Sequence, residues 1–293
     1  MSEQVSAGTV EESELPVRVY AAQTVSESIP RSIVTAAKDL QDTQEVIWRL
    51  FFRDAVMHSR QKLIGHLWAI AHPIMGMASF VLLSGVGVLN PGELSIPYPI
   101  FLFFSMSLWT LFVGSVSTVG GGLLTQGDLV LRTSVPKITL ALAGLPMFLC
   151  IQLVNGIILC VLMVALGTTP SWWSFVLPFV VFPFLALGVG VGLILAVFGV
   201  LTRDVTGMVT STLNVLMYVT PVIYVQKPQH PLLQIVVDYN PLTYLVAFPR
   251  ELFFEGATPY YQGFLLASVF GCAVLILGIH GFYLIQDKVA ERL

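Results

Sequence analysis

The sequence predicts an all-α integral membrane protein with six transmembrane helices. Its 293 residues are 56% hydrophobic and only 11% charged, whereas an ordinary soluble domain has about 25% charged residues. The charges are unevenly placed, and the long stretches between them contain no Asp, Glu, Lys or Arg. A helix needs roughly 20 apolar residues to cross a bilayer core. Each charge-free stretch is therefore long enough for at least one span.

We expect the spans over six ranges: 66–89, 99–123, 138–166, 174–202, 205–225 and 264–285. The longest charge-free stretch holds two of them, separated by a turn at 167–171. With the N-terminus inside, twelve of the fourteen Lys and Arg residues fall on the inner side. The positive-inside rule therefore places both termini in the cytoplasm.

Two kinds of segment precede the first span. The start of the chain is rich in Ser, Glu, Thr and Val and lacks a sustained period, which is typical of disorder. A helix follows in which Glu45, Arg49 and Arg53 recur on one face and apolar residues occupy another, as in helices that lie in the headgroup plane. The alternative for this helix is a simple surface anchor. The chain thus divides into a disordered cytosolic tail (1–42), an amphipathic interfacial helix (43–62) and a transmembrane domain (63–293).

The segment 226–262, between the fifth and sixth expected spans, is too apolar for a free loop and too charged for another span. Two short re-entrant helices in the outer leaflet, broken at Asn240 and Pro241, fit this pattern. Irregular backbone at membrane depth is tolerated only against protein or a water-filled path. The segment is therefore the expected outer lid of a conduit, and a surface hairpin without a gating role is the alternative.

The chemistry of other membrane protein classes is missing from the sequence. No charged residue lies in the middle of an expected span, whereas ion-coupled transporters commonly keep such groups there. The sequence contains no HExxH, no G-x-S-x-G and no phosphate-binding G-x-x-x-x-G-K-[ST]. The closely spaced Gly188, Gly190 and Gly192 are explained by close helix packing. These features favour a passive conduit driven by a partner, without catalytic residues, a metal site or nucleic acid; an ion-coupled transporter and a membrane enzyme are the alternatives.

Several stretches resemble the polysaccharide-export permeases of the type-two ABC transporter group. The most specific is the Leu-Gly-x-Leu-Trp-Ala-type run that ends at Ala69 and is followed by Pro73. Val135-Pro136-Lys137, Arg203-Asp204 and Asn240-Pro241-Leu242 also match, in the family's order and at expected span boundaries. The resemblance covers the chain from about residue 43 onward. One departure is His58, which stands where the family often has a basic residue.

The resemblance implies a permease of the bacterial inner membrane that works as a homodimer with two separate cytosolic ATPase subunits. ATP and Mg²⁺ would belong to those subunits, and this chain would hold no cofactor. The implied substrate is a lipid-linked polysaccharide, such as O-antigen, on an undecaprenyl-diphosphate-type carrier. Membrane lipids are the remaining expected partners. Export of a teichoic acid, a smaller lipid or a drug is the alternative.

The resemblance also assigns a role to the short segment after the second span, which would transmit closure of the ATPase. Gly127 and Asp128 are a plausible start for a short helix there, with leucines as an apolar knob and basic residues as cationic contacts. A solvated positive-inside loop is the alternative. The expected ATPase contacts are Asp128, Leu129, Leu131, Arg132 and Lys137.

Three more groups of residues are candidates for contact with the substrate. A lipid diphosphate entering from the cytosol would be guided by Arg49, Arg53 and Arg60. Aromatic faces suit a glycan path, although Tyr98, Phe101 and Tyr224 equally fit an interfacial aromatic belt. The candidates for the path are Trp109, Tyr218, Phe104 and Tyr224. The candidates for the outer gate are Asn240, Pro241, Tyr244 and Arg250.

Overall fold

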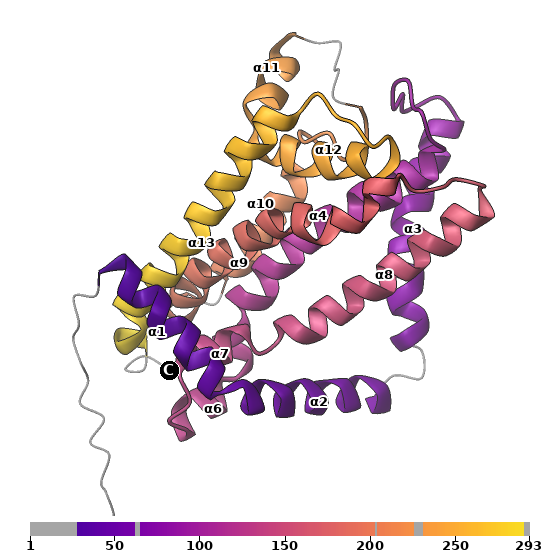
Figure 1. Ribbon diagram of the computed structural model, residues 1–293. Helices are drawn as coiled ribbons and strands as arrows, with labels where there is room; N and C mark the ends of the chain where they lie inside the picture. The colour runs from indigo at the N-terminus through magenta and orange to yellow at the C-terminus, as the bar shows by residue number, and fades with distance from the viewer. Residues whose placement is uncertain (1–27, 62–64, 203, 226–230, 290–293) are drawn as a thin grey trace, which may run out of the picture.

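The computed structural model describes residues 28–61, 65–202, 204–225 and 231–289, and within these ranges the chain is helical and contains no strand. The long helices run between two ends of the molecule (Figure 1). At one end lie α2 and α6, and at the other lie α11 and α12. The elements are α1 (Ile29–Asp42), α2 (Gln44–Gln61), α3 (Gly65–Gly85), α4 (Tyr98–Gly120), α5 (Gly122–Thr125), α6 (Gly127–Arg132), α7 (Lys137–Leu142), α8 (Leu145–Ala165), the 3₁₀ turn η1 (Trp172–Val176), α9 (Leu177–Leu201), α10 (Val205–Leu216), α11 (Pro231–Tyr239), α12 (Pro241–Phe254) and α13 (Tyr261–Val289).

Four of the expected spans are present as helical segments that are long and apolar enough to cross a membrane. In the described part of the chain these are Tyr98–Gly120, Lys137–Ala165, Trp172–Gly199 and Tyr261–Gln286. They coincide with the second, third, fourth and sixth expected spans. The first and fifth are represented by shorter apolar helices, Pro73–Gly85 and Val205–Leu216. A multi-pass helical membrane fold is thus confirmed, and the count of six remains a prediction.

The fifth expected span is shorter than its apolar stretch. Helix α10 ends at Leu216, and residues 217–225 form turns and bends instead of continuing the helix to 225. Pro221 cannot donate a backbone hydrogen bond, and the hydroxyl of Thr220 donates to the Leu216 carbonyl. The turn segment therefore presents backbone carbonyl groups that side chains elsewhere in the chain can bind.

The expectation of disorder up to residue 42 is wrong for its last part, because helix α1 covers Ile29–Asp42. Ser32 and Ala36 of α1 are buried. The Oγ of Ser32 lies 3.0 Å from His280 Nδ1 of α13, so contacts with the far end of the chain hold this helix. Local composition shows nothing of a contact between residues 248 positions apart. Residues 1–27, to which the expectation also applies, lie outside the described residues.

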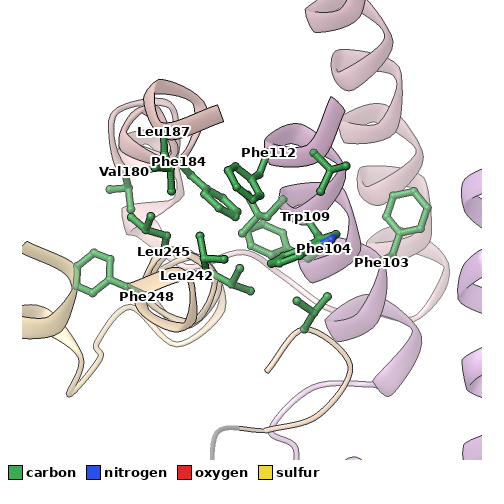
Figure 2. Packing of buried hydrophobic residues seen from close by; sticks show 14 of the residues in the cluster. Phe103, Phe104, Trp109, Phe112, Val180, Phe184, Leu187, Leu242, Leu245 and Phe248 are labelled. Atoms are coloured by element: carbon green, nitrogen blue, oxygen red, sulfur yellow. The ribbon is translucent and has the colours of Figure 1, made fainter. Parts of the chain in front are cut away.

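The main hydrophobic core lies between α4, α9 and α12. Figure 2 shows Trp109 and Phe112 of α4 beside Phe184 of α9, with α12 residues next to them. The Phe112 and Phe184 rings are stacked with centroids 4.9 Å apart. A Cβ on Gly190 would lie 2.6 Å from the Leu275 backbone nitrogen of α13, which confirms that close helix packing explains a glycine at this position.

Candidate functional site

The end of the molecule that carries α11 and α12, which the charge distribution predicts to be the outer end, is organised around a buried charge. This is Arg250 of α12, which is only 3% exposed. Its Nη1 donates to Ser105 Oγ of α4 and to the Pro221 carbonyl of the turn segment, at 3.0 Å each. Its guanidinium carbon lies 4.1 Å from the centroid of the Phe101 ring. Burial lowers the pKa of Arg250 to about 10, although Glu251 opposes the shift, so the side chain is protonated at neutral pH. A buried charge is tolerated when it has such partners.

The start of α12 is fixed to the same turn segment. Asn240 is the N-cap: its Oδ1 accepts from the Leu242 amide and its Nδ2 donates to Thr220 Oγ1, both at 3.0 Å. Pro241 occupies the first helical position, where its missing N–H costs nothing. Three of the four expected gate residues, Asn240, Pro241 and Arg250, therefore belong to the connection between α12 and residues 217–225.

Tyr244, the fourth expected gate residue, has different partners. Its hydroxyl donates to the Asp238 carbonyl of α11 at 2.7 Å, and its ring packs on Tyr260. Burial raises the pKa of Tyr244, and the nearby Asp238 carboxylate raises it further. Tyr244 thus holds α11 to α12. Sequence reasoning missed the partners of the expected gate residues, which are Ser105, Thr220 and Pro221. The available signal was the Thr-Pro pair near the end of the fifth expected span.

A small cavity adjoins Arg250. Its volume is about 60 Å³, and its lining includes Glu93, Ser95, Glu251 and Glu255. Ser95 Oγ donates to Glu255 at 2.7 Å. A volume of this size accommodates a few water molecules, and its lining is rich in carboxylates. Among the described residues, no group of three His, Cys, Asp or Glu side chains is placed to hold a metal ion.

The predicted ATPase-contact segment forms a short helix, α6, at the opposite end. Asp128 lies in its first turn and Arg132 in its last, so each charge complements the helix dipole. Leu131 is 58% exposed, while Leu129 packs against the smaller hydrophobic core. The expected start is off by one residue, because Gln126 occupies the N-cap position and α6 begins at Gly127. Leu131, flanked by opposite charges, is therefore the exposed apolar residue of this helix.

Lys137 begins helix α7 and, unlike the other four expected ATPase contacts, lies outside helix α6. Its Nζ donates to the Gln286 carbonyl of α13 at 2.7 Å. Cations are favourable at the C-terminal end of a helix, where unpaired carbonyl groups gather. Lys137 thus joins α7 to the end of α13, which sequence spacing does not reveal.

Of the three arginines proposed to guide a headgroup, Arg49 and Arg53 have different surroundings. The Arg49 side chain is 81% exposed and pairs with Glu45 at 3.4 Å. Arg53 turns toward the protein, where its Nη2 donates to Gln126 at 3.1 Å. The side chain of Arg60 lies outside the described part of the structure. Trp48 and Phe52 are also exposed on α2, and the interfacial position of this helix stays a prediction.

The aromatic residues proposed for a glycan path are also separated. Trp109 and Phe104 are buried in the core, since α9 and α12 cover the face of α4 that carries them (Figure 2). The Tyr224 hydroxyl donates to the Val219 carbonyl at 3.0 Å. Tyr218 is 54% exposed and lies near Phe80. Within one chain, only Tyr218 of the four has most of its ring at the surface, and the set does not line a common path.

Long apolar helices, a helix α2 across one end and short helices at the other define a multi-pass membrane protein (Figure 1). The chain belongs to the ABC-2 type transporter family, whose model matches residues 45–254. Members of this family are transport subunits and are not enzymes themselves, and membership implies an ATPase partner.

Two similar proteins cover most of the chain. The O-antigen export system permease protein RfbA of Klebsiella pneumoniae is 22% identical over 247 residues, which are 82% of this chain and 92% of the relative. The protein of the same name from Myxococcus xanthus is 25% identical over 230 residues, which are 78% of this chain and 87% of the relative. The similarity therefore extends over nearly the full length of these permeases.

Proposed function

We propose that this chain is the membrane subunit of an ATP-driven exporter that moves a lipid-linked, O-antigen-like polysaccharide out of the cytosol. The observation that carries the proposal is the match to O-antigen export permeases over 87–92% of their length. Two copies would form the channel in a bacterial inner membrane, with both termini in the cytoplasm. Two separate ATPase subunits would bind ATP and Mg²⁺.

The placement of residues supports a path between two copies over a path within one. In a single chain Trp109 and Phe104 are buried in the core, and two larger cavities, of about 380 and 510 Å³, are lined mainly by apolar side chains, which suits a glycan poorly. Tyr218, in contrast, presents most of its ring at the surface. We infer that surface aromatic residues such as Tyr218 face the glycan in the dimer, where rings stack on the apolar faces of sugars.

At the cytosolic end, two exposed features support the proposed contacts. Leu131 stands between Asp128 and Arg132 on α6, which suits insertion into an ATPase groove of mixed charge. Among the described arginine side chains of α2, Arg49 remains available for a lipid diphosphate, since its pairing with Glu45 is solvent-exposed and weak. Arg53 is already bound to Gln126.

The proposal is tested in a strain that lacks this chain and carries either the unmodified gene or an Arg49→Glu variant. The strain without the chain should accumulate lipid-linked glycan inside and lose it from the surface, and the unmodified gene should restore export. Arg49→Glu should restore it incompletely, because the variant reverses the charge that a diphosphate would meet. Surface glycan that is normal without the chain would refute the proposal.

The identity of the accumulated lipid separates the alternatives. Mass spectrometry of lipid extracts distinguishes a sugar polymer on a polyprenyl diphosphate from a teichoic acid or a smaller lipid. Removal of the ATPase partner should have the same effect as removal of this chain. Export that continues without the ATPase, driven by an ion gradient, would indicate a secondary transporter instead.

A further inference from the structure

Two side-chain hydrogen bonds join helix α1 to the cytosolic half of α13. Ser32 is fully buried, with its Oγ 3.0 Å from His280 Nδ1. The Tyr283 hydroxyl donates to Asp39 Oδ2 at 2.6 Å. His280 and Tyr283 are three residues apart, and Ser32 and Asp39 are seven apart, so each pair shares one helix face. The two bonds therefore fix the rotation and the register of α1 against α13.

The end of α1 is joined to α7, the helix that follows the ATPase-contact helix α6. The Thr43 hydroxyl donates to the Asp39 carbonyl, so Thr139 of α7 is the donor in the 2.7 Å hydrogen bond between the two threonine hydroxyls. Two residues before Thr139, Lys137 donates to the Gln286 carbonyl of α13. Helix α7 is thus bonded both to α1 and to α13.

The residue before α6 is also bonded to the α1–α2 segment. Gln126, which immediately precedes α6, is buried and accepts a hydrogen bond from Arg53 of α2. In α5, a Cβ on Gly122 would collide with the Ala141 backbone of α7, so these two helices touch through their backbones. Side-chain bonds to the α1–α2 segment therefore lie on both sides of α6, at Gln126 and at Thr139.

We propose that α1 is a brace that makes α6, α7 and the cytosolic end of α13 move as one unit, with Ser32, Asp39, His280 and Tyr283 as its positioning residues. This inference rests on the proposed ATP-driven export. Helix α13 has 29 residues and spans about 43 Å at 1.5 Å per residue. At its outer end the Phe264 ring stacks on Phe248 of α12, with centroids 4.1 Å apart. Displacement of α6 by the ATPase would thus reach the helix that carries Arg250.

Spatial proximity alone does not demonstrate coupling, so the test measures motion. In a background in which Cys150, Cys160 and Cys272 are replaced by Ala, spin labels are placed through Thr133→Cys and Leu284→Cys, two exposed positions beside α6 and on α13. The labelled chain is assembled with its ATPase in nanodiscs. With the brace intact, the distance distribution between the labels should stay unchanged when ATP is added. With Ser32→Ala and Tyr283→Phe combined, ATP should shift or broaden it.

Matched variants separate a positioning role from general damage. Asp39→Asn keeps an acceptor for the Tyr283 hydroxyl and should behave like the unmodified chain. Tyr261→Phe removes a hydroxyl from an exposed tyrosine at the other end of α13 and should also have no effect. The combined variant should lower glycan exported per ATP hydrolysed by about three- to tenfold, while co-purification of the ATPase is unchanged.

The outcomes distinguish the brace from the function on which it rests. An ATP-induced distance change that is equal with and without Ser32→Ala and Tyr283→Phe would overturn the brace, and so would an equal loss of coupling in Tyr261→Phe. Absence of glycan export by the unmodified complex would overturn the proposed function. The distance measurement would still decide on the brace, because it depends on ATP and not on the glycan.

Discussion

Two arginines at opposite ends of this molecule, Arg250 and Arg49, differ sharply in their exposure. At the predicted outer end Arg250 is almost fully buried and has its partners within the chain, in α4 and in the turn before α11. At the opposite end, which is predicted to be cytosolic, Arg49 and the apolar Leu131 are exposed. A charge in a medium of low dielectric constant must be bonded internally, whereas an exposed one is free to bind a partner. The difference supports the proposal that contacts within the chain close the outer end, while Arg49 and Leu131 at the cytosolic end meet other molecules.

The largest effect is expected from Arg250→Leu. This change leaves the Pro221 carbonyl and the Ser105 hydroxyl without their charged donor, and a hydrogen bond to a charged group is worth about 1.5–3 kcal/mol. We expect the free energy of unfolding to fall by about 3 kcal/mol or more, measured by denaturant titration in mixed micelles. Arg49→Leu is the exposed control and should change it by less than about 0.5 kcal/mol. Equal losses would contradict the contrast between the two ends.

The predicted cytosolic end also contains a close contact between helices α5 and α7, and Gly122→Ala tests this contact. A Cβ at this position would collide with the Ala141 backbone of α7, and overpacking of this kind costs about 1–3 kcal/mol. Gly127→Ala is the matched control, since nothing lies within 4 Å of its Cβ position. The control should be neutral or more stable by up to about 1 kcal/mol, because alanine favours helix. If both variants unfold alike, α5 and α7 do not touch as described.

A smaller loss of stability is expected from Asn240→Ala at the outer end. The change removes the cap of α12 and its hydrogen bond to Thr220, and loss of an N-cap costs about 1 kcal/mol. Thermal unfolding monitored by tryptophan fluorescence should show a lower melting temperature. Asn240→Asp keeps the capping oxygen and should recover most of the difference. If Asn240→Asp is as unstable as Asn240→Ala, the loss comes from the hydrogen bond to Thr220 and not from the cap.

Sequence reasoning succeeded where a local pattern carries the information. Charge-free stretches located four spans within a few residues, and the turn residues Asn240 and Pro241 located the start of α12. It failed where a contact joins distant parts of the chain, as between Ser32 and His280. It also failed for Trp109, because an aromatic residue in an apolar span has the same local pattern whether lipid, glycan or protein covers it. The sequence singled out Arg250 but could not supply its partners in α4 and in the turn segment.

The smallest effect on stability is expected from Leu131→Ala, and this variant tests the exposed end most directly. Leu131 is 58% exposed, so its truncation should change the free energy of unfolding by less than about 0.5 kcal/mol. If the residue is buried against the ATPase, the same truncation should weaken binding by about tenfold, since tenfold corresponds to about 1.4 kcal/mol.

Leu129→Ala provides the reverse pattern, because Leu129 packs inside the chain. It should lower stability by about 1 kcal/mol or more and affect ATPase binding only through folding. The two variants are compared by the amount of ATPase that co-purifies with each and by their unfolding curves. A Leu131→Ala chain that retains the ATPase as well as the unmodified chain would show that exposure at this end does not mark the contact. The contrast between a closed outer end and an open cytosolic end would then be supported only by the exposed Arg49 on α2.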